Sequence, residues 1–135
     1  MRKPHFRTVR CIIRRGDTFL LVVHRGPRKG SRRSWGLPGG RVEPNENFED
    51  TARREIHEEL RITLGPLREV GTYRYKGSFH KVLGTEHHDS IITFDRSELL
   101  KIGWHTLEEV VGLAAGGQLH AGFEAAAIRD FLALL

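Results

Sequence analysis

The sequence predicts a single α+β domain in which helices pack on a mixed β-sheet. Segments rich in Val and Ile alternate with two amphipathic segments of helical period, and this interleaving is typical of a layered α+β fold. The chain has 135 residues, which is enough for one sizeable hydrophobic core but not for two. No internal repeat or low-complexity stretch divides the chain. We therefore expect one domain over residues 1–135.

The amino-terminal part predicts a β-hairpin followed by a basic loop. Residues 6–15 and 18–24 are rich in β-branched side chains, with Gly16-Asp17 as the turn between them. Residues 25–33 hold five basic residues, two Gly and one Pro, which indicates an exposed loop. Short strands are then expected over residues 35–37 and 41–43, around a turn at residues 38–40.

The middle of the chain predicts the first of the two main helices. Either Asn45 or Asn47 can cap it. Its buried stripe is expected to consist of four apolar residues spaced four apart, namely Phe48, Ala52, Ile56 and Leu60.

The remaining elements are expected to be three strands and two further helices. The strands are predicted over residues 67–75, 79–83 and 90–94, and a short helix over residues 108–113. Residues 120–135 predict a terminal amphipathic helix. Its inner face is expected to carry Phe123, Ala127, Phe131 and Leu134.

The charge is distributed unevenly along the chain. The net charge is +5, but residues 1–34 contain eleven Lys or Arg and only one acidic residue, Asp17. Residues 35–135 contain eleven basic and sixteen acidic residues. A basic first third beside an acidic region suits an anionic substrate held between them, although a general solubility charge gives the same pattern.

Cysteine content and hydropathy favour a cytoplasmic protein that does not cross a membrane. Cys11 is the only cysteine, so no internal disulfide can form, and its apolar neighbours predict a buried, inert thiol. The longest strongly apolar run covers residues 19–23, far short of the roughly 20 residues that span a bilayer. The basic amino terminus lacks the apolar core of a secretory signal.

Three carboxylates lie on one face of the first predicted helix. Glu55, Glu58 and Glu59 fall within an arc of roughly 100°. Such like charges weaken an ordinary helix by a few tenths of a kcal/mol per pair, whereas Mg²⁺ takes oxygen ligands and turns the repulsion into coordination. The triad alone fits either a divalent-cation site or a solvated acidic helix face.

The spacing around this triad resembles a known family motif. Residues 40–62 read G-x5-E-x7-R-E-I-x-E-E-x-R-I, which resembles the Nudix box, G-x5-E-x7-R-E-U-x-E-E-x-G-U with U apolar, of the Nudix (MutT-like) hydrolases. The preceding W-G-L-P-G also resembles the usual approach to that box. The resemblance implies a Nudix-type α/β/α sandwich with a central mixed β-sheet. The matching positions are Gly40, Glu46, Arg54, Glu55, Ile56, Glu58, Glu59 and Ile62.

The resemblance also implies roles for the box residues. Mg²⁺, or Mn²⁺, is expected to be bound by Glu55, Glu58 and Glu59 with help from the backbone carbonyl of Gly40. Glu58 is expected to be the most sensitive catalytic residue, either as a metal ligand or as a base for water. Arg54 either acts in catalysis directly or forms an ion pair with Glu46 that orients the ligands.

Two further positions bear on the expected site. Some Nudix enzymes carry an acidic residue in a loop that reaches back to the metal, so Glu98 is a candidate ligand or general base, or else a solvent-facing side chain. Arg61 stands where the box usually has glycine. A left-handed backbone at this residue costs about 1 kcal/mol without glycine, unless the helix ends differently.

Substrate contacts are predicted from the basic loop and the aromatic residues. Arg25, Arg28 and Arg33 are candidates for binding phosphates, although a solvated loop has the same composition. Trp35 could stack on a nucleobase, a contact worth roughly 1–3 kcal/mol. Tyr73, Tyr75 and Phe79 are further candidates, and each of these aromatic residues equally fits a core or strand position.

The resemblance predicts a Mg²⁺-dependent hydrolase that cleaves the diphosphate linkage of a nucleoside diphosphate joined to another moiety. Nucleoside triphosphates, nucleotide sugars and dinucleotides all fit. One alternative is a non-hydrolytic nucleotide-binding module, which typically lacks box carboxylates that this chain retains. The other is an RNA 5′-end pyrophosphohydrolase held through the basic first third, with steep salt dependence. The protein is expected to be a monomer or a homodimer.

Overall fold

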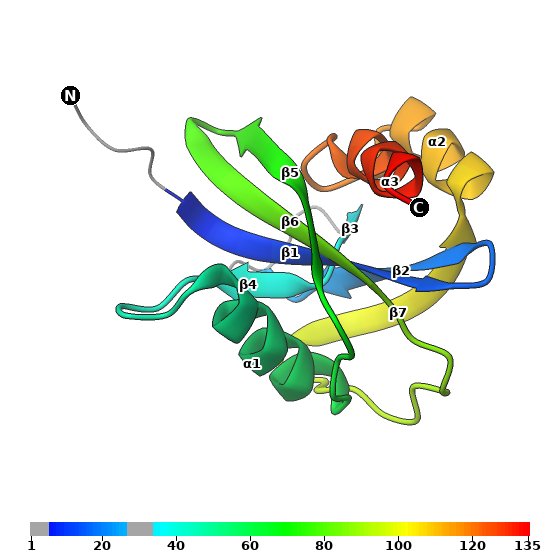
Figure 1. Ribbon diagram of the computed structural model, residues 1–135. Helices are drawn as coiled ribbons and strands as arrows, with labels where there is room; N and C mark the ends of the chain where they lie inside the picture. The colour runs from blue at the N-terminus through cyan, green and yellow to red at the C-terminus, as the bar shows by residue number, and fades with distance from the viewer. Residues whose placement is uncertain (1–5, 27–33) are drawn as a thin grey trace.

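The computed structural model describes residues 6–26 and 34–135. A mixed sheet of seven strands lies between helix α1 on one face and helices α2 and α3 on the other (Figure 1). The path through the sheet is β3-β2-β1-β6-β5, with β4 paired to β1 and β7 paired to β2. This arrangement confirms the predicted α+β fold and the three-layer α/β/α sandwich.

Two antiparallel hairpins meet in the middle of the sheet. The first consists of β1 (Phe6–Arg15) and β2 (Thr18–His24), and the second of β5 (Arg68–Tyr75) and β6 (Ser78–Glu86). Strands β1 and β6 run parallel, which makes the sheet mixed. The sequence predicted these four strands, although β6 extends beyond the expected residues 79–83.

Strands β1 and β2 pair only near their turn, at Arg14↔Phe19 and Arg15↔Thr18. Farther from the turn, β4 (Gly39–Arg41) pairs with β1 and β3 (Trp35–Gly36) pairs with β2. The expected turn at residues 38–40 and strand at residues 41–43 are therefore wrong in position. Gly39 and Gly40 already belong to β4 and pair with β1.

The last strand was expected in the wrong place. Residues 90–94 form no strand, and Ile92 is 94% exposed. Instead β7 (Leu99–Thr106) pairs along β2, from Thr18↔Thr106 to His24↔Leu99. Residues 90–94 favour a strand by composition, but no neighbouring strand in the described part of the chain pairs with them.

The helices match the predicted segments with shifted ends. Helix α1 (Phe48–Leu60) is capped by Asn47, which accepts a hydrogen bond from Asp50 N–H at 2.7 Å. Helix α2 (Leu107–Ala115) begins with a capping box between Thr106 and Glu109. Helix α3 (Glu124–Ala133) starts later than the expected residue 120. Leu134 is 39% exposed, so its predicted place on the inner face is wrong.

Each face of the sheet has its own hydrophobic core. Val9, Cys11 and Val22 face α1, whereas their strand neighbours Ile12 and Leu21 face α2 and α3. This alternation follows from the two-residue period of a strand. Burial raises the pKa of Cys11 to about 12, so its thiol is inert as predicted.

None of the described helices is long and apolar enough to cross a membrane.

Candidate active site

The carboxylates of Glu55, Glu58 and Glu59 lie along the second half of α1, from the solvent side to the sheet. The exposed fractions of their side chains are 18%, 53% and 3% respectively. Glu58 therefore points into solvent, Glu55 lies at the boundary, and Glu59 is buried beneath the strands. Three like charges in this gradient are unfavourable without a cation or hydrogen-bond donors beside them.

Glu55 packs directly against the backbone of Gly40. A Cβ at residue 40 would overlap the Glu55 carboxylate where it now lies, so any other residue at this position would have to displace that carboxylate. Partial burial raises the pKa of Glu55, and the charge of Glu59 acts in the same direction, against a hydrogen bond from Arg54 that lowers it. The structure thus brings together two of the expected metal-binding groups.

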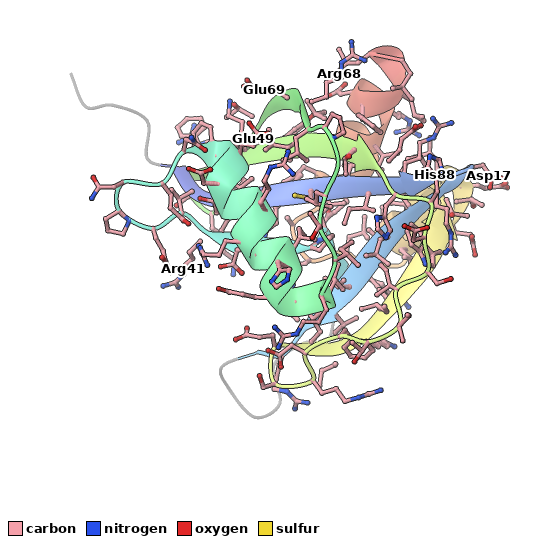
Figure 2. The ribbon with its side chains drawn as sticks, turned by 60° about the horizontal axis from the view of Figure 1, so that its bottom comes forward. Asp17, Arg41, Glu49, Arg68, Glu69 and His88 are labelled. Atoms are coloured by element: carbon pink, nitrogen blue, oxygen red, sulfur yellow. The ribbon has the colours of Figure 1, made fainter. Side chains whose placement is uncertain are left out.

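Arg54 connects α1 to the loop that precedes it. Its Nε and Nη2 donate to Glu46 Oε2 and Oε1 at 2.7 and 2.9 Å, the expected ion pair in a bidentate geometry. Its Nη1 lies 2.9 Å from Glu55 Oε1 and 3.5 Å from Glu58 Oε2. Nη2 also donates to the carbonyl of Arg41 at 3.0 Å, and Figure 2 shows Arg41 beside α1.

This arrangement restrains two of the three carboxylates from one side. The hydrogen bonds from Arg54 lower the pKa of Glu46 to about 2, and the bond to Glu46 raises the pKa of Arg54. Both groups are therefore charged throughout the physiological range. Their ion pair fixes the guanidinium that contacts Glu55 and Glu58.

Glu59 is held from the other side by groups on β2 and β4. Its Oε1 accepts from Gly39 N–H at 3.0 Å, and its Oε2 lies 3.1 Å from His24 Nε2. Because a carboxylate can only accept, His24 Nε2 is the donor. Arg10 Nη1 donates to the carbonyl of Gly39 at 3.1 Å, and its 3.5 Å approach to His24 Nε2 brings two donors together rather than forming a hydrogen bond.

The sequence reasoning did not identify Arg10 or His24. Arg10 lies between the buried residues Val9 and Cys11, and His24 follows five consecutive buried residues, 19–23. A polar side chain at such a position requires a buried partner. That signal was available, but its partner Glu59 lies far away in the sequence.

Glu98 belongs to a turn that packs against the end of α1. Asp95 N–H donates to the carbonyl of Glu59 at 2.8 Å, and Arg25 N–H donates to the carbonyl of Glu98 at 2.8 Å. The Glu98 side chain is exposed. Among the described residues, the structure records no hydrogen bond or ion pair of that side chain, so its expected role stays a prediction.

The predicted substrate-binding residues are dispersed. The Arg25 side chain is exposed and donates to the carbonyl of Arg96 at 3.0 and 3.2 Å. Arg28 and Arg33 lie outside the described residues. Trp35 packs on the face of the sheet that carries α2 and α3, with Lys101 Nζ 5.0 Å from its ring centroid and the His105 ring 4.7 Å away. Trp35 therefore lies across the sheet from the carboxylates of α1.

Arg61 ends α1 in the left-handed conformation that the box glycine usually adopts. Its φ is 56° and ψ is 34°, and its N–H donates to the carbonyl of His57 at 3.0 Å. The exit geometry is therefore retained at a cost of about 1 kcal/mol. Hydrogen bonds from Ser97 lower the pKa of Asp95, and the positive charge of Arg61 acts in the same direction. This attraction offsets part of the backbone cost.

The residues at this site suit a hard divalent cation. Among residues 6–26 and 34–135, no three His, Cys, Asp or Glu side chains already converge as ligands. The donors available beside Gly40 are all oxygens, which is the ligand chemistry of Mg²⁺. Because Gly40 has no Cβ, its backbone lies directly against the Glu55 carboxylate. The exposed Glu58 has room to turn toward both groups.

The family model of the NUDIX domain matches residues 4–127. This chain belongs to the Nudix hydrolase family. The match covers all seven strands, α1 and α2, and the first residues of α3.

The Nudix chain is similar to longer curated proteins over part of their length. It is 32% identical over 112 residues to the NAD-capped RNA hydrolase NudC of Erwinia tasmaniensis, covering 79% of this chain and 42% of that protein. It is 44% identical over 55 residues to the nucleoside triphosphatase NudI of Escherichia fergusonii, covering 40% and 39%. The matches thus span about 40% of the length of these relatives.

Solved structures share the fold over nearly the whole chain. A NUDIX hydrolase from Nitrosomonas europaea superposes with a TM-score of 0.75 at 24% identity, covering 97% of this chain and 90% of that one. A MutT NUDIX hydrolase from Burkholderia pseudomallei gives a TM-score of 0.62 at 26% identity, covering 79% and 86%. These likenesses support the three-layer fold of the Nudix chain.

Proposed function

We propose that this Nudix protein is a hydrolase that uses Mg²⁺ or Mn²⁺ to cleave the diphosphate linkage of a nucleoside diphosphate joined to another moiety. The observation that carries the proposal is the set of three carboxylates on α1, with Glu55 against Gly40 and Arg54 behind. Family membership supports the same reaction. When bound, the cation would neutralise charge on the diphosphate and lower the pKa of the attacking water.

The protein residues supply positioning and a proton acceptor. Glu55, Glu59 and the Gly40 carbonyl would hold the cation, because they are the groups fixed by packing and hydrogen bonds. Glu58 is half exposed and its nearest cation, Arg54, is 3.5 Å away, so its carboxylate can either join the ligands or accept the proton of the water. Arg54 Nη1 contacts both Glu55 and Glu58 and would hold them in place, a role that matters because positioning and electrostatics dominate phosphoryl transfer.

The substrate class is proposed at the level of a small nucleoside diphosphate derivative. NudI is described as a nucleoside triphosphatase and NudC as a hydrolase of NAD-capped RNA. The second candidate is therefore an RNA 5′ end, which the similarity to NudC favours. A non-hydrolytic binding module fits less well, because every box carboxylate is present.

The test is product release from a panel of diphosphate-linked nucleotides, with Mg²⁺, with Mn²⁺ and with chelator. Glu58→Gln is expected to lower kcat by roughly 100-fold or more, the usual range for loss of a proton-transfer group. Glu49→Gln is the matched control, since Glu49 lies near the start of the same helix (Figure 2) and pairs with Arg53. Absence of turnover on every compound, together with a thermal shift from one of them, would establish the binding module instead.

A further inference from the structure

A group of basic and aromatic side chains lies on the face of the sheet opposite α1. The ring centroid of Tyr75, at the end of β5, is 5.6 Å from that of His120 and 6.0 Å from that of His80. Lys76 Nζ lies 5.4 Å from the centroid of the same ring. We call this group the Tyr75 cluster (Tyr75, Lys76, His80 and His120). Lys76 and His120 are exposed to solvent, whereas His80 is buried.

The Tyr75 cluster is connected to the carboxylate site through β1. The hydroxyl of Thr8 lies 2.6 Å from His80 Nδ1. Arg10, two residues further on the same face of β1, donates to the carbonyl of Gly39 at 3.1 Å. Gly40 follows directly and contacts Glu55. Strand β1 thus contacts both the Tyr75 cluster and the strand that carries Gly40.

The electrostatic environment of this cluster is positive. Burial lowers the pKa of His120, and the further causes are all positive groups, namely Arg10, His24, Lys76 and His80. The carboxylate that also faces Arg10 from this side is Glu124. Glu124 is 1% exposed, and its oxygens accept from the N–H groups of Gly122 and Ala121 at 2.7 and 2.9 Å. Its charge is thus compensated by the backbone of its own loop.

We propose that the Tyr75 cluster binds a phosphate on the nucleoside part of the substrate, additional to the diphosphate that is cleaved. Tyr75 offers a ring on which a sugar or base can pack, and Lys76, His120 and Arg10 offer donors to the phosphate oxygens. The phosphate comes either from a ribose phosphomonoester of a small nucleotide or from the 3′-phosphodiester of an RNA. The identity of the substrate rests on the proposed function, whereas phosphate binding does not.

The first experiment measures binding of stable nucleotides by calorimetry in the presence of Mg²⁺. Adenosine 3′,5′-bisphosphate is expected to bind roughly 10-fold more tightly than AMP, as one charge-assisted contact provides. Lys76→Asn and His120→Asn are expected to remove this preference. Asn suits residue 76 because its φ of 49° is left-handed. Equal affinities of the wild-type protein for the two nucleotides would overturn the proposal.

Arg68→Gln is the control for the loss of one positive charge on the same strand. Arg68 is exposed at the opposite end of β5, paired with Gly84 rather than near Tyr75, and its place is labelled in Figure 2. The preference for the bisphosphate should persist in this variant. A loss as large as that of Lys76→Asn would show that only net charge matters, and would also overturn the proposal.

The second experiment identifies the source of the phosphate from two matched substrate pairs. NADPH differs from NADH by one phosphate group on a ribose. A 5′-triphosphorylated dinucleotide differs from ATP by a 3′-phosphodiester and one nucleoside. A lower KM within the first pair indicates a small nucleotide, and within the second pair an RNA. Equal KM values in both pairs would contradict phosphate binding by the Tyr75 cluster. Absence of any hydrolysis would contradict only the proposed reaction, and the calorimetric comparison of the two nucleotides would then decide the phosphate-binding proposal.

Discussion

Glu59 shows how single residues set the geometry of the site. Its carboxylate is buried, and its two oxygens are approached by Gly39 N–H and by the imidazole of His24. A buried carboxylate without such donors would be strongly destabilising. The donors come from β2 and β4, so the position of this carboxylate is determined by the sheet as well as by its own helix.

His24 is therefore expected to position Glu59 for metal binding. His24→Ala leaves Glu59 Oε2 without its donor, which should weaken Mn²⁺ binding by about 10- to 100-fold and lower the free energy of unfolding by about 1–3 kcal/mol. His24→Gln retains an N–H donor and should recover most of the Mn²⁺ affinity and most of the free energy of unfolding. Titration with Mn²⁺ followed by electron paramagnetic resonance measures the first effect, and urea unfolding measures the second. Mn²⁺ affinity equal to wild type in His24→Ala would contradict this role.

The ion pair between Glu46 and Arg54 predicts a specific pH dependence. The pKa of Glu46 falls from 4.5 to about 2 on folding, chiefly through its hydrogen bonds with Arg54. Because the folded-state value is the lower one, the stabilisation is complete above about pH 4.5 and is lost as the pH falls toward 2. Glu46→Gln should therefore melt below the wild-type protein at pH 7, with the difference shrinking across that window. Glu108→Gln, on the exposed side of α2, controls for net charge, and a difference that persists at pH 2 would refute the assignment.

At the scale of elements, the close approach of β4 to α1 depends on Gly40. Gly40→Ala inserts a methyl group into the Glu55 carboxylate and should cost about 1–3 kcal/mol, as overpacking does. Gly112→Ala is the matched control, since a Cβ there meets nothing within 4 Å and the residue lies in α2. That change should stabilise the protein by roughly 0.5–1 kcal/mol. Urea unfolding of both variants tests the contrast, which fails if the two have the same sign.

Elements were predictable from sequence where local pattern and pairing agree. The two hairpins and α1 combine short-range partners with clear periodicity, so their positions followed from composition and turn residues. Strand β7 lies about eighty residues from its partner β2 in the sequence, and Gly103 interrupts its pattern. Residues 90–94 show the reverse case, because β-propensity without a neighbouring strand does not produce a strand.

The residues of the candidate site likewise divide into those that the sequence predicts and those that it does not. The box carboxylates, Gly40 and the Glu46–Arg54 pair follow from fixed spacing around one helix. Arg10 and His24 reach Glu59 only through the separation of β1 from β2, which depends on β3 and β4 filling that gap. Such long-range geometry has no local signature beyond a polar residue on an apolar strand.

For the whole molecule, the layering places the two candidate binding regions on opposite faces of the sheet. Helix α1 carries the carboxylates on one face, and the segment before α3 carries His120 on the other (Figure 1). Arg10 lies on β1 between them, near the charges of Glu59 and Glu124.

The same layering couples cation binding to global stability. Because Gly40 meets Glu55 only when α1 packs on the sheet, Mg²⁺ should bind the folded state and not the unfolded chain. At a concentration 100 times its Kd, the cation then adds about 2.7 kcal/mol to the free energy of unfolding, on the order of 10 °C in Tm for a chain of this size. Calorimetry with Mg²⁺ and then with excess chelator measures the shift, which Glu58→Gln should reduce. Sodium chloride at matched ionic strength separates binding from screening of the carboxylates, and an equal shift with sodium chloride would show that these three residues hold no specific cation.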